Sequence, residues 1–72
     1  MDRSAIAESI VQYLARHPAA KDSARGIVFW CFAMSGVSPP EALVQDVLDG
    51  LVRDERVGSS VLVDGTRIYH VR

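Results

Sequence analysis

The side chains in this sequence that could do chemistry are one cysteine, two histidines and a scatter of serines. A nucleophile needs an adjacent base, and a metal site needs Cys and His ligands at a recognisable spacing. Cys31 lies inside an apolar run, where a thiol is normally inert packing, and His17 and His70 share no motif with it. The five glycines form no phosphate-binding loop. The sequence therefore predicts no catalytic residue, no metal, no cofactor and no small-molecule ligand.

Contact with nucleic-acid phosphates is a second kind of chemistry, and it needs Lys and Arg side chains on a shared surface. The formal net charge is −1, whereas nucleic-acid binders usually carry a basic excess. The outward face of the helix expected to end near Arg53 presents Glu41, Gln45, Asp46 and Asp49. Its three carboxylates would repel a polyanion, and Gln45, although able to pair with adenine, is interpreted as solvated. The candidate phosphate contacts are scattered arginines: Arg53, Arg56, Arg67 and Arg72.

Contact with another protein is the third kind, and a short apolar segment favours it. From residue 24 to about residue 34, every position except Arg25 is apolar or small. On a helical wheel Arg25 and Phe29 point outward with Phe32 and Ala33 beside them, whereas Trp30 points toward the core. The predicted protein-interaction residues are therefore Arg25, Phe29, Phe32 and Ala33, with the N-terminal segment or the C-terminal hairpin folding over Phe29 as the alternative. Trp30 is expected to be a core anchor, and a base-stacking platform is its alternative role.

Three helices must position these residues. Apolar periodicity predicts a first helix over residues 2–17, capped by Asp2 or Ser4 and stopped before Pro18. Residues 18–21 are short and extended, and could add an edge strand. Asp22 or Ser23 is expected to cap the second helix, which ends near Ser35-Gly36.

The third helix has the clearest pattern. Ser38 is the expected cap, Pro39 the first helical residue and Glu41 the partner in an S-x-x-E capping box. Gly50 lies at the border of the apolar face, either tolerated there or required by close approach of another backbone. Six apolar residues share one face at helical spacing: Leu43, Val44, Val47, Leu48, Leu51 and Val52.

A β-hairpin is predicted over residues 57–71, with Asp64-Gly65 as a two-residue type I′ loop. That loop would set Val63 opposite Thr66 and Val61 opposite Ile68. Both faces of the hairpin carry apolar residues, so alternation alone does not determine which face meets the helices. A bulge, or a partner on the second face, would account for this pattern.

The order helix, extended segment, helix, tight turn, helix, hairpin resembles the winged helix-turn-helix domain. Gly36-Val37-Ser38 in the turn and the apolar periodicity of residues 43–52 carry the resemblance, and the sequence RVGSSVLVDGTRIYHV is similar to the wing. Tyr69 and Val71 resemble the pair that closes such wings onto the helices. The resemblance implies an α+β fold of order α-β-α-α-β-β, with residues 1–72 as one domain. Such domains serve as transcription regulators, nucleic-acid-end readers or protein–protein modules.

The sequence therefore favours two functions. The first is a non-enzymatic protein-interaction module, an adaptor or a homodimer. The alternative is a DNA-binding transcriptional regulator that contacts DNA through the wing or the first helix. The single cysteine excludes an intrachain disulfide framework, no leader-like segment opens the chain, and the longest apolar run is far short of the roughly 20 residues of a membrane span. The expected setting is cytoplasmic, with no membrane partner.

Overall fold

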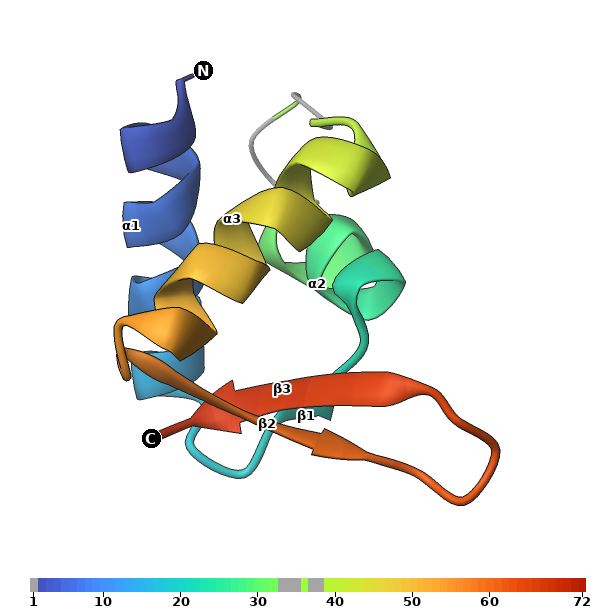
Figure 1. Cartoon of the computed structure of the whole chain (residues 1–72). Helices are drawn as coiled ribbons and strands as arrows, with labels where there is room; N and C mark the ends of the chain where they lie inside the picture. Colours follow the sequence, from blue (N-terminus) through green and yellow to red (C-terminus); the bar gives the residue numbers. More distant parts are fainter. Residues whose placement is uncertain (1, 33–35, 37–38) are drawn as a thin grey trace.

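Six elements follow one another in the computed structural model, which describes residues 2–32, 36 and 39–72. Three helices pack together on one side of a three-stranded antiparallel sheet, and α3 crosses between α1 and α2 in Figure 1. This is the predicted α+β class and element order, and the topology is consistent with a winged-helix-like fold. The elements are α1 (Arg3–Arg16), β1 (Lys21–Asp22), α2 (Ala24–Cys31), α3 (Glu41–Arg53), β2 (Val57–Val61) and β3 (Arg67–Val71).

The first two helices begin at caps that the sequence predicted. The Asp2 carboxylate accepts a hydrogen bond from the backbone N–H of Ala5 at 2.8 Å, and the Ser23 hydroxyl accepts one from Gly26 at 3.2 Å. Each bond satisfies a backbone donor that the first turn of a helix leaves unpaired. Between the two helices, the segment expected to be extended forms the edge strand β1.

The start of α3 differs from the prediction. Its N-cap is Pro40, which makes no side-chain capping bond, and the helix begins at Glu41. Pro39 is therefore not the first helical residue, because a residue that precedes a proline is pushed out of the α region. The expected cap Ser38 lies outside the described residues. The predicted apolar face is confirmed: Val44, Val47, Leu48 and Leu51 are buried, and Leu43 and Val52 are partly buried.

The end of α3 is a Schellman motif that the sequence did not reveal. The N–H of Glu55 donates to the carbonyl of Val52 at 3.0 Å, and the N–H of Arg56 donates to that of Leu51 at 2.9 Å. Glu55 has a φ of 61°, the left-handed conformation that glycine usually supplies at this position. The motif turns the chain sharply from α3 into β2.

The hairpin forms where predicted, but its register is shifted by one residue. Val61 pairs with Arg67 rather than with Ile68. The loop has three residues, because Leu62 and Thr66 close it with a 2.8 Å backbone bond and Gly65 N–H donates to the Leu62 carbonyl at 2.9 Å. Gly65 has a φ of 91°, so the turn ends in a glycine bulge rather than a type I′ pair. A shift of one residue exchanges the two faces of a strand.

This register decides which face of the sheet meets the helices. Val57 and Tyr69 are buried against them, and the order β1-β3-β2 places β3 in the middle of the sheet. On the opposite face the His70 ring covers Gly58 so closely that a Cβ there would lie 2.3 Å from the ring carbon Cε1. The core joins all three helices and the sheet: Ile6, Ile10, Leu14, Ala24, Ile27, Phe32, Val44, Val47, Leu48, Leu51, Val57 and Tyr69.

Candidate interaction surfaces

Two neighbouring aromatic side chains lie on the outside of α2. Phe29 is 65% exposed and Trp30 is 61% exposed. Their rings meet edge to face, with centroids 5.0 Å apart. We call Phe29 and Trp30 the aromatic pair. The exposure of Phe29 confirms its predicted outward position, and the alternative in which other segments cover it is wrong.

Two sequence assignments on this helix are wrong. Trp30, expected in the core, is exposed, whereas Phe32, expected beside the interaction patch, is 4% exposed and belongs to the core. The fourth predicted interaction residue, Ala33, lies outside the described residues. The helix ends at Cys31 rather than near residue 34, so the wheel does not apply to Phe32.

The face of α2 was misjudged because the helix is apolar nearly all round. Its inward stripe consists of Ala24, Ile27, Val28 and Cys31. Ile27 and Cys31 were predicted to point inward, whereas Trp30, predicted beside them, points outward. The smaller residues fit against α1 and α3, and the largest side chain is left outside. A helix whose only charged residue is Arg25 has no polar face that would show which side points to solvent. Its rotation about its own axis therefore depends on how its side chains pack against α1 and α3.

Arg25 shares a face with Phe29, one helical turn away. Its side chain is 86% exposed, and its Nε lies 3.9 Å from Oε2 of Glu41 at the start of α3. An exposed ion pair of this length contributes little to stability. The guanidinium therefore remains open to a partner that binds at the aromatic pair.

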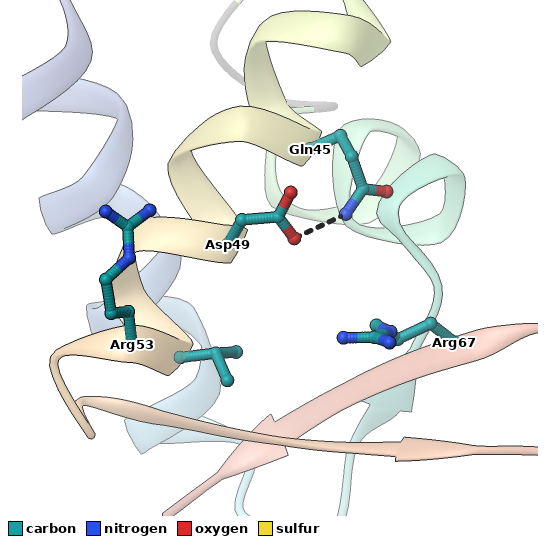
Figure 2. Close-up of a pocket in the computed structure, with 5 residues that line it drawn as sticks. Gln45, Asp49, Arg53 and Arg67 are labelled. Carbon is teal, nitrogen blue, oxygen red and sulfur yellow. Dashed lines mark hydrogen bonds between the residues drawn. The ribbon is translucent and has the colours of Figure 1, made fainter.

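A groove runs along the outward face of α3 beside β3 (Figure 2). Its larger part has a volume of about 650 Å³. A neighbouring hollow of about 380 Å³ shares Gln45 and Arg67 with it and reaches Arg25 on α2. We call the two together the α3–β3 groove. The larger part is lined by Gln45, Asp49, Val52, Arg53 and Arg67.

Gln45 is a structural part of this groove, although the sequence predicted it to be solvated. It is partly buried, and its Nε2 donates to the hydroxyl of the fully buried Tyr69 and, at 3.0 Å, to Oδ1 of Asp49. Figure 2 shows the Gln45 amide turned toward Asp49. A side-chain amide has two N–H donors, and both are used here. Bidentate pairing with adenine would require one of them.

The four arginines of the alternative nucleic-acid surface do not form one stripe. Arg53 and Arg67 line the α3–β3 groove from α3 and β3, and no ion-pair partner for either lies among the described residues. Arg56 instead pairs with Glu8 of α1 at 3.6 Å. The fourth cation, Arg72, pairs with Glu55 at 3.5 Å.

The acidic side chains of α3 also have partners. Asp46 forms an ion pair with Arg3 of α1, and Glu41 faces Arg25. Asp49 accepts the hydrogen bond from Gln45. The negative charge counted along α3 in the sequence is thus partly balanced by neighbouring elements.

The far end of the hairpin is apolar. Val61 is 60% exposed, Leu62 is 47% exposed and Val63 is entirely exposed.

Asp64 at the turn accepts a 2.9 Å hydrogen bond from the backbone N–H of Thr66, which lowers the pKa of the Asp64 carboxyl group. From residue 61 to residue 66 the hairpin end carries no cation.

Cys31, His17 and Ser9 line one hollow of about 220 Å³ together with Tyr13, whereas His70 lies on β3 outside it. Burial raises the pKa of the Cys31 thiol to about 11, so it is protonated at neutral pH, and its Sγ lies 3.5 Å from the carbonyl of Ser9. Burial, with the charge of Asp22 next, raises the pKa of Tyr13, whose ring centroid lies 4.9 Å from that of His17. His70 contacts its own strand and Ser60 on β2.

Within residues 2–32, 36 and 39–72, no group of three His, Cys, Asp or Glu side chains could hold a metal ion. None of the helices described for this chain is long and apolar enough to cross a membrane. Comparison with models of known families, with curated proteins and with solved structures found no match.

Proposed function

We propose that this chain is a winged-helix domain that acts as a non-enzymatic protein-interaction module. The observation that carries the proposal is the aromatic pair, two large rings that are more than half exposed on one short helix. Aromatic residues and arginine are the types most enriched at interface hot spots, and Arg25 lies one turn from Phe29.

The size of this surface fits an anchor within a larger contact. Aromatic side chains present about 150–250 Å² each, so the exposed fractions leave roughly 250 Å² of ring surface. A stable interface buries about 800 Å² on each partner. The aromatic pair would thus supply about a third of such a contact, and surrounding residues would supply the rest.

Sedimentation equilibrium and thermal melting of Phe29→Glu test this proposal. Because Phe29 is exposed, the variant should melt within a few degrees of the native chain. If the partner is a second copy, the native chain should self-associate between about 10 µM and 1 mM and the variant should not. A large loss of melting temperature would place Phe29 in the core and remove the proposed surface.

The alternative, a DNA-binding regulator, has one supporting observation: Arg53 and Arg67 line the same groove. Against it stand the engaged donors of Gln45, the carboxylate of Asp49 within the groove and the cation-free end of the hairpin. In about 0.1 M salt we expect random duplex DNA to bind no tighter than about 10⁻⁴ M. Submicromolar binding with a steep salt dependence would favour the regulator.

A further inference from the structure

We infer that the partner is a protein segment that carries acidic residues beside a large apolar residue, and that its acidic part lies in the α3–β3 groove. This inference rests on the proposed function, because it uses the aromatic pair as the site for the apolar residue. The groove reaches Arg25, which stands one helical turn from Phe29. A single extended segment can therefore touch both surfaces.

Charge complementarity selects an acidic segment. Three arginines, Arg25, Arg53 and Arg67, line the groove, against two carboxylates, Glu41 and Asp49. Glu41 already faces Arg25, and Asp49 already accepts a bond from Gln45. Arg53 and Arg67 have no ion-pair partner among the described residues, and Arg25 has only its exposed 3.9 Å pair with Glu41. A planar guanidinium is well suited to bind a carboxylate through two N–H donors.

A two-fold contact with a second copy fits this surface less well. If the two α2 helices packed in parallel around the aromatic pair, the two Arg25 side chains would approach each other, since each lies one turn from Phe29. If the helices packed antiparallel, each Arg25 would meet the other α2 beyond its aromatic pair, and α2 itself has no carboxylate to offer. Acidic residues on a different protein would give Arg25 a carboxylate partner.

Nucleic acid also fits less well. Phosphate groups repeat at close intervals along a strand, and tight binding neutralises several of them at once. Here the carboxylate of Asp49 lines the larger part of the groove together with Arg53 and Arg67, and it would repel a phosphate group bound there. A peptide can place one or two carboxylates at the arginines and apolar atoms at Val52 and the aromatic pair.

The test is selection from a phage-displayed library of random twelve-residue peptides on the immobilised full chain. The selected peptides are then labelled and measured by fluorescence anisotropy. We expect enrichment of Asp and Glu next to Trp, Phe or Leu. Arg67→Gln and Trp30→Ser should each weaken binding about tenfold or more. Arg16→Gln, which removes an exposed cation on α1 away from the groove, should not change the affinity.

The outcomes separate the two claims. Peptides that require Trp30 but lack acidic residues, or that bind Arg67→Gln as tightly as the native chain, would overturn the inference and leave the proposed function intact. Peptides that bind Trp30→Ser and Phe29→Ser as tightly as the native chain would reject the proposed contact surface itself. Failure to enrich any peptide, or displacement of the peptides by a random 20-base-pair duplex at lower concentration, would also overturn the inference.

Discussion

Replacing Phe32 by alanine tests whether Phe32 belongs to the core, although the sequence predicted it beside Phe29 in one interaction patch. Phe32 is 4% exposed and contacts the main core, so its truncation removes buried contacts and leaves a cavity. Such a change costs about 3–5 kcal/mol. A domain of this length has a total stability of about 4–11 kcal/mol, so the loss is between about a quarter and all of it. Each kcal/mol lowers the melting temperature by about 4–8 °C, which predicts a fall of at least about 12 °C.

Thermal and urea unfolding followed by far-UV circular dichroism measure this effect. The matched control is Phe29→Ala, which removes the same atoms from an exposed site and loses only its edge-to-face contact with Trp30, about 1 kcal/mol. If Phe32→Ala does not fold, Phe32→Leu should still fold and lose about 1–2 kcal/mol. Equal melting temperatures for Phe29→Ala and Phe32→Ala would refute the assignment of Phe32 to the core.

Four further outcomes follow from the backbone and the partly buried Cys31 thiol. Gly50→Ala should raise the free energy of unfolding by about 0.5–1 kcal/mol in urea titrations, because a Cβ there meets no atom within 4 Å. Gly65→Val should lower it by about 1 kcal/mol or more, because Gly65 has a φ of 91°, a conformation that a residue with a Cβ adopts only at a cost. Glu55→Gly should raise it by about 0.5–1 kcal/mol in the same titrations, since glycine adopts the left-handed conformation at lower cost. The folded chain keeps the Cys31 proton up to about pH 11, whereas an unfolded thiol loses it near pH 8.5. The free energy of unfolding should therefore fall as the pH rises between these two values. Melting curves recorded across this pH range should show that decline in the native chain, and Cys31→Ala should remove the part that the thiol causes.

The open space beside Gly50 also decides between the two interpretations of that residue. No other backbone approaches it in the described part of the chain, so close approach from within the chain is wrong. Close approach of a partner's backbone stays a prediction.

The sequence predicted those parts of the fold that depend on local chemistry. Asp2 and Ser23 cap their helices because short polar side chains reach the first free N–H groups, and the apolar face of α3 follows from its spacing alone. The hairpin was placed by Asp64-Gly65, but its register depends on whether Val63 belongs to the strand or the loop. In the observed register, Val57 and Tyr69 lie buried on the face that meets the helices.

The candidate sites were predictable only in part. Phe29 was identified as exposed, but Trp30 was missed because α2 carries almost no polar residue to orient its wheel. The α3–β3 groove combines residues more than twenty positions apart, such as Gln45 and Arg67. The hydrogen bond that holds Gln45 to Tyr69 is likewise contained in no local pattern. In the sequence, Arg53 and Arg67 are two of four scattered arginines, and their spacing does not group them.

The sheet order β1-β3-β2 has a consequence for how the chain acquires its structure during synthesis. The middle strand is the last of the three to be translated, so neither β1 nor β2 has a hydrogen-bonding neighbour until β3 has left the ribosome. The helices come from contiguous segments and can begin to associate earlier. Sheet formation in this protein is therefore a late step, and a ribosome stalled before residue 67 would carry helices with no sheet beneath them.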